Sequence, residues 1–125
     1  MFYTLKNEKL NVRINSLGAE LTSVLSDSGY EHIWQGEEWK KHAPVLFPTC
    51  GALLNGRYSY KGTEYSLEKH GFAKLCDFEA VEASDTSLTL MLKANEKTLS
   101  VYPFDFTLEA KYSINAATLC ASYTV

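Results

Sequence analysis

The chain has 125 residues, of which 46% are hydrophobic and 22% charged, and its formal net charge is -3. This length suits a single domain over residues 1–125, and the small negative charge leaves no basic surplus to neutralise phosphates, so we expect no nucleic-acid partner. No apolar run approaches the roughly 18 residues that span a bilayer. The first residues show no basic stretch followed by an apolar one, which predicts a cytoplasmic protein with no membrane partner.

The chemistry-bearing side chains show no metal-binding pattern. Cys50, Cys76 and Cys120 are an odd-numbered and widely separated set without a C-x-x-C pair, which argues against a disulfide framework and a zinc site. His32 and His42 have no Cys or His neighbour at ligand spacing. We therefore expect no metal, and we expect the cysteines to be small buried hydrophobic residues in a reducing compartment.

Alternation of apolar and polar residues dominates the chain, and a period of two predicts β-strands. In chain order, we expect strands at residues 10–15, 57–60, 87–92, 104–114 and 118–125. The alternation over 104–114 is the cleanest of the five. Many short strands separated by turns predict an all-β protein, built as an antiparallel β-sandwich.

Residues typical of turns separate these strands. Asn55-Gly56 suits a type I′ hairpin, because both central residues of that turn need positive φ. Pro44 and Pro48 flank an apolar segment and restrict it to an edge strand or a short buried crossing. Further turns are expected at Asp27–Gly29, Lys61-Gly62, Ser84-Asp85 and Asn115-Ala116.

Helix is expected at only two places. Residues 94–101 can form a short helix that Asn95 caps and that ends before Pro103. Residues 37–41 are the second candidate.

The most specific motifs lie between residues 39 and 74. Trp39 precedes Ala43-Pro44-Val45-Leu46-Phe47-Pro48, a short hairpin follows, and His70-Gly71-Phe72-Ala73-Lys74 comes next. Ser16–Leu21 and Tyr102–Phe106 extend the same pattern over nearly the whole chain. With these motifs the chain resembles the aldose 1-epimerase (mutarotase) family, in particular its small bacterial branch. Family members are much longer, so the resemblance implies that this chain is the N-terminal half of a galactose mutarotase-like supersandwich, a truncated domain.

The resemblance implies an isomerase of carbohydrate metabolism that interconverts the α and β anomers of a hexose. A base removes the proton of the C1 hydroxyl while an acid protonates the ring oxygen, and no metal or cofactor is needed. In the family the acid is a His and the base a Glu, and both lie beyond the position that matches Val125. No catalytic residue is therefore assigned here, and the resemblance implies that the chain alone is inactive.

Two residues are candidates for substrate binding. The resemblance places His70 against the sugar, and imidazole can donate to or accept from a hydroxyl. Lys74 stands where the family has Arg, which keeps the charge and loses the planar fork; it could hold a sugar hydroxyl or a phosphate. The alternatives are a loop histidine bonded within the protein and a solvated lysine. Ala52 stands where the family has a sugar-contacting Arg, and Arg57 is not an obvious substitute.

Three functions remain open: an inactive part of an aldose 1-epimerase-like enzyme, a non-catalytic module that binds a sugar or sugar phosphate, and one half of a two-chain assembly. Trp34, Trp39 and Phe72 could stack on sugar faces, although most aromatic residues are expected in the core and Trp39 is expected to be structural. Half of a sandwich should expose sheet edges and an apolar face. This predicts self-association.

Overall fold

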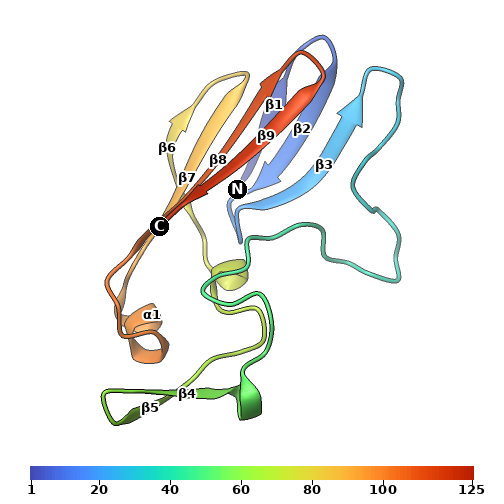
Figure 1. The fold of residues 1–125 in the computed structure, drawn as a ribbon. Coiled ribbons are helices and arrows are strands. Elements are labelled where there is room, and N and C mark those ends of the chain that lie inside the picture. Colours follow the sequence, from blue (N-terminus) through green and yellow to red (C-terminus); the bar gives the residue numbers. More distant parts are fainter.

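The computed structural model describes residues 1–125 and is almost entirely β, with three antiparallel sheets (Figure 1). Their strand orders are β1-β2-β3, β4-β5 and β6-β7-β8-β9. The strands are β1 (Phe2–Lys6), β2 (Leu10–Asn15), β3 (Glu20–Ser26), β4 (Arg57–Tyr60), β5 (Thr63–Ser66), β6 (Glu79–Ala83), β7 (Ser87–Lys93), β8 (Thr107–Asn115) and β9 (Thr118–Thr124). The helical elements are α1 (Glu96–Val101) and two single 3₁₀ turns, η1 (Leu54–Gly56) and η2 (Ala73–Leu75). The prediction of an all-β antiparallel fold is confirmed.

One hydrophobic core lies between the three-stranded and the four-stranded sheet. It contains 17 buried residues, and the alternating apolar residues of β2, β7 and β8 supply most of them. Those with at most 1% exposure on these strands are Val12, Ile14, Leu88, Leu90, Leu108, Ala110 and Tyr112. The β4–β5 hairpin lies apart from both sheets, near α1 (Figure 1).

Four predicted strands form at their expected places, as β2, β4, β7 and β9. The expected strand over 104–114 begins only at Thr107, so the prediction was wrong for its first residues. Phe104 and Phe106 join an aromatic cluster instead. Their ring centroids lie 4.7 Å from Tyr60 and 5.1 Å from Phe47, respectively.

Four strands, β1, β3, β5 and β6, were not predicted. The pairings of β3 and β6 contain register shifts, with Thr22 as the extra residue in β3 and Val81 as the extra residue in β6. A bulge of this kind breaks the period of two on which the prediction depends.

The helix predictions have opposite outcomes. The α1 helix forms as expected, and the Asn95 side chain accepts hydrogen bonds from the backbone N–H of Lys97 (3.0 Å) and Thr98 (3.2 Å). Residues 37–41 contain a turn and no helix, because a single turn is costly to nucleate. Their loop is instead tied to β3 where Leu21 pairs with Ala43. None of the helices is long and apolar enough to cross a membrane.

The turn at Asn55-Gly56 has the expected positive φ values of 55° and 67°. No strand precedes it, so the prediction of a hairpin there was wrong. The hairpin between β4 and β5 turns at Lys61-Gly62, where φ is 50° and 81°. The proline-flanked segment forms no named strand: Val45 is buried, Leu46 is exposed, and Phe47 makes an isolated bridge to Gly71.

Two expectations of burial were wrong. Cys50 lies in a loop and Cys120 on the exposed edge strand β9, and both are exposed, whereas Cys76 is half-buried. Burial raises the pKa of the Cys76 thiol. Trp39 was expected to be structural, yet it lies in the loop after β3 with 66% of its surface exposed.

Candidate functional site

The candidate site is formed by two loops, residues 47–51 and 68–74, which backbone hydrogen bonds join. The carbonyl of Phe47 accepts from the N–H groups of Phe72 (3.0 Å) and Ala73 (3.2 Å), and the carbonyl of Gly51 accepts from the N–H of His70 (3.1 Å). Gly71 has a φ of 67°, and a Cβ there would lie 2.1 Å from the oxygen of Phe47. Only glycine fits this approach, so the backbone fixes the position of His70.

His70 is half-buried and has a φ of 72°, in the left-handed region. Its Nδ1 is hydrogen-bonded to the carbonyl oxygen of Cys50. A carbonyl only accepts, so Nδ1 carries the proton and Nε2 is the acceptor of the neutral ring. No protein group bonds to Nε2, which leaves this nitrogen to accept a hydrogen bond from a ligand hydroxyl.

Lys74 is the last residue of the same loop and lies in the 3₁₀ turn η2. Its ammonium donates to the carbonyl of Lys69, the residue before His70. The turn at Gly18 packs against the backbone of Lys74, and a Cβ on Gly18 would lie 3.0 Å from its carbonyl oxygen. The structure thus joins the Ser16–Leu21 motif to the His70–Lys74 motif and brings the two predicted site residues onto one loop.

Ala52 and Arg57, the two positions considered for a sugar-contacting arginine, add no charge to the loop of residues 68–74. Ala52 is exposed and has no polar side-chain atom. Arg57 lies on β4, where its guanidinium pairs with Glu64 at 2.8 Å. No group of three or more His, Cys, Asp or Glu side chains is arranged to hold a metal ion.

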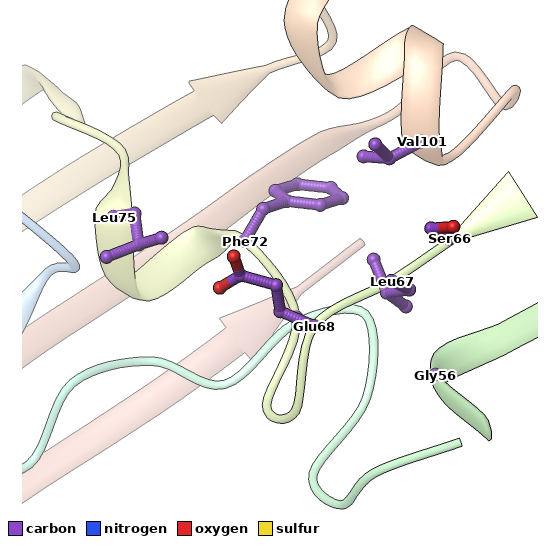
Figure 2. Close-up of a pocket in the computed structure, with 8 residues that line it drawn as sticks. Gly56, Ser66, Leu67, Glu68, Phe72, Leu75 and Val101 are labelled. Carbon is purple, nitrogen blue, oxygen red and sulfur yellow. The ribbon is translucent and has the colours of Figure 1, made fainter. Parts of the chain in front are cut away.

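A cleft of about 450 Å³ lies on the neighbouring side of the 68–72 turn (Figure 2). Phe72, Leu67, Leu75 and Val101 line it, and Glu68 is its one ionisable side chain. Figure 2 shows the Glu68 carboxylate beside Phe72 and Leu75. Sugar sites need several convergent polar groups, so this mostly apolar cleft is poorly suited to a monosaccharide.

Sequence reasoning missed two features of this region. The carbonyl of Cys50 orients the His70 ring, and Glu68 faces the cleft. A backbone acceptor and a single glutamate leave no pattern in a sequence. Phe72, considered as a platform for sugar stacking, instead packs among aromatic rings, with centroid distances of 5.8 Å to both Phe47 and Phe106.

Comparison of the sequence with known protein families matches residues 1–125 to aldose 1-epimerase. The chain belongs to the aldose 1-epimerase family. Among curated relatives, the plasmid and chromosomal LacX proteins of Lactococcus lactis subsp. lactis are 34% and 33% identical to it over 132 residues. The match covers 100% of this chain and 44% of each LacX protein.

Solved structures of the family have the same fold. A galactose mutarotase related enzyme from Lactobacillus acidophilus superposes with a TM-score of 0.95 at 42% identity, over 98% of this chain and 42% of that one. A galactose mutarotase-like protein from Lactobacillus casei superposes with a TM-score of 0.94 at 33% identity, over 98% and 43%. The chain therefore spans less than half the length of the family members that it matches.

Proposed function

We propose that this chain supplies the sugar-contacting part of an aldose 1-epimerase-type site, with His70 as hydrogen-bond partner of a hexose hydroxyl. One observation carries the proposal. The bond from Nδ1 of His70 to the Cys50 carbonyl sets the tautomer and leaves Nε2 free, within the motif for which the family resemblance implies sugar contact. A side chain oriented in this way loses little freedom when it binds.

Lys74 extends the proposal to phosphorylated sugars. Its ammonium carries three donors and spends one on the Lys69 carbonyl. Two donors and the positive charge remain for a hydroxyl or a phosphate oxygen close to His70. A sugar phosphate should therefore bind more tightly than the corresponding free sugar.

Catalysis is proposed to need residues that this chain does not provide. Mutarotation requires an acid and a base on opposite sides of the reacting atoms. Beside His70 and Lys74, Glu68 is the nearest carboxylate in sequence, and it faces the apolar cleft. We therefore propose that the chain alone binds the sugar without speeding the exchange of its anomers.

Binding can be tested by titrating ¹⁵N-labelled chain with glucose, galactose and their 6-phosphates while amide shifts are followed. We expect shifts in residues 47–51 and 68–74 that saturate, and we expect His70→Ala to abolish them. His32→Ala is the matched control, because His32 is an exposed histidine that packs against Tyr30. Unchanged spectra for a folded protein at high sugar concentration would refute the proposal.

The β9 strand supports the proposal that the chain also pairs with another β-rich partner, including a second copy. One side of β9 pairs with β8 and the other side is free. The strand contains no charged residue and no proline, the usual protections of an edge. Its inward-facing Tyr123 lies opposite the fully buried Ala110 and is nevertheless 56% exposed.

A cytoplasmic location stays a prediction. The three cysteines are all free, which suits a reducing compartment. Reaction of the chain with a thiol probe in intact and lysed cells would test it.

A further inference from the structure

A second polar pocket, of about 260 Å³, lies on the outer face of the β1-β2-β3 sheet. Its floor is formed by side chains of the sheet, including Phe2, Arg13 and Glu20, and its wall by the loop after β3, including Gln35 and His42. None of these residues belongs to the loops that carry His70. The pocket is thus separate from the site described above.

The loop that forms the wall is anchored to the sheet by side-chain hydrogen bonds. The amide nitrogen of Gln35 donates to the carbonyl of Thr22 at 2.9 Å, and the backbone N–H of His42 donates to Oε1 of Glu20 at 2.7 Å. Nδ1 of His42 donates to the carbonyl of Trp34 at 2.9 Å. The wall therefore has a defined position over the sheet without a ligand.

The pocket holds two cations that have no anionic partner. The guanidinium of Arg13 lies 4.2 Å from the centroid of the Phe2 ring. Neither the Arg13 guanidinium nor the Lys40 ammonium takes part in an ion pair or a hydrogen bond, in contrast to the Lys9 ammonium, which pairs with Asp27 at 2.7 Å. The planar Arg13 fork, held against an aromatic ring, is suited to bind an oxyanion through two parallel hydrogen bonds.

The same pocket also holds acceptors without donors. Glu20 uses Oε1 for the His42 backbone and has no partner at Oε2. Gln35 uses its amide nitrogen twice, toward Thr22 and Ile33, and has no partner at its amide oxygen. A simple anion would leave these acceptors unpaired. A neutral polyol would leave the pocket with two cations, Arg13 and Lys40, against the single carboxylate of Glu20.

From this combination we propose that the pocket is a second binding site, for a small polyol that carries an oxyanion, such as a sugar phosphate or a sugar acid. The oxyanion lies between Arg13 and Lys40, and ligand hydroxyls donate to Glu20 and Gln35. The proposal does not depend on sugar binding at His70.

The site can be tested by titrating ¹⁵N-labelled full chain with glucose 6-phosphate, gluconate, glucose and inorganic phosphate. We expect the phosphate ester and the sugar acid to shift the amides of Glu20, Thr22 and His42, with glucose and inorganic phosphate at least about tenfold weaker. Loss of a charge-assisted hydrogen bond in Arg13→Gln should weaken binding by about tenfold or more. Lys40→Gln should act in the same direction and serves if Arg13→Gln fails to fold.

Two controls separate this site from the first one. Lys93→Gln removes an exposed charge elsewhere and should change nothing, and His70→Ala should leave these shifts intact. Absence of shifts around Glu20, or an Arg13→Gln affinity equal to that of the unmodified chain, would overturn the proposal. Binding of inorganic phosphate as tight as that of glucose 6-phosphate would also overturn it, because the site would then recognise a bare anion.

Discussion

The phenol of Tyr112, in β8, donates a 2.7 Å hydrogen bond to the carbonyl of Ala19, in the turn before β3. Tyr112 is 1% exposed and Ala19 is fully buried, so the bond ties the two facing sheets together inside the core. Burial raises the pKa of the Tyr112 phenol. The group therefore stays a protonated donor throughout the range in which the protein can be studied.

Tyr112→Phe should lower the free energy of unfolding by about 1–3 kcal/mol, because it leaves the buried Ala19 carbonyl without a donor. Urea denaturation at pH 7 measures the change. Tyr123→Phe is the control, since Tyr123 is 56% exposed and its hydroxyl makes only a long contact of 3.4 Å with that of Tyr112, so its loss should cost much less. Equal losses of unfolding free energy in the two variants would contradict a stabilising role for the hydrogen bond to Ala19.

Gly71→Ala should destabilise the fold severely, by about 3 kcal/mol or more, because the added Cβ meets the Phe47 backbone at 2.1 Å. Gly62→Ala is a matched control. It has a φ of 81° and open space around the new Cβ, so it should cost only about 1 kcal/mol. Thermal melts of the two variants make the comparison, and a small loss at position 71 would contradict the close approach that fixes His70.

Glu31 anchors the loop after β3. Burial acts to raise its pKa, but hydrogen bonds from the Ser23 hydroxyl (2.5 Å) and the N–H groups of Ile33 (2.9 Å) and Val24 (2.8 Å) outweigh this and hold the pKa below its ordinary value of 4.5. A depressed carboxyl pKa stabilises the fold above the ordinary value, and this contribution is lost as pH falls through the folded pKa.

Glu31→Gln should therefore cost about 1 kcal/mol at pH 7, and the difference from the unmodified chain should shrink below pH 4.5. Denaturant titrations at several pH values test this. Glu38→Gln, an exposed residue of the same loop without a hydrogen-bond partner, serves as control. A difference that does not change with pH would mean that the charge of Glu31 has no part in anchoring the loop.

The free edge of β9 predicts association that depends on concentration. Ala121→Lys places a charge on the inward side of this edge strand and should shift the protein toward the monomer. Light scattering after size-exclusion chromatography gives the mass directly. Thr63→Lys, on the exposed β5 strand, should leave it unchanged. A monomer at all concentrations for the unmodified chain would rule out pairing with a second copy.

The sequence predicts those parts of the fold that follow from regular alternation. The strands around Val12, Leu90 and Ala110 could be predicted because their inner residues repeat every second position. The bulges at Thr22 in β3 and at Val81 in β6 break this period, so these two strands were missed. Register and bulges depend on contacts between distant segments, which no local pattern records.

The candidate site could likewise be predicted from the sequence only in part. His70 could be found from the motif around it, whereas its orientation depends on the Cys50 carbonyl, 20 residues away in the chain. The exposure of Cys50 was also missed, because the residue type alone does not show whether a cysteine lies in a loop or in the core.

The central claim is that this chain provides the sugar contact of His70 without the acid and base of mutarotation. Exchange NMR on the purified chain mixed with glucose, galactose or their 6-phosphates tests it most directly, because one sample reports both binding and the rate of anomer interconversion. We predict amide shifts around His70 that the His70→Ala variant loses, with an exchange rate equal to that of the sugar in buffer. Faster exchange that His70→Ala abolishes would contradict the claim, because the chain would then supply its own acid and base.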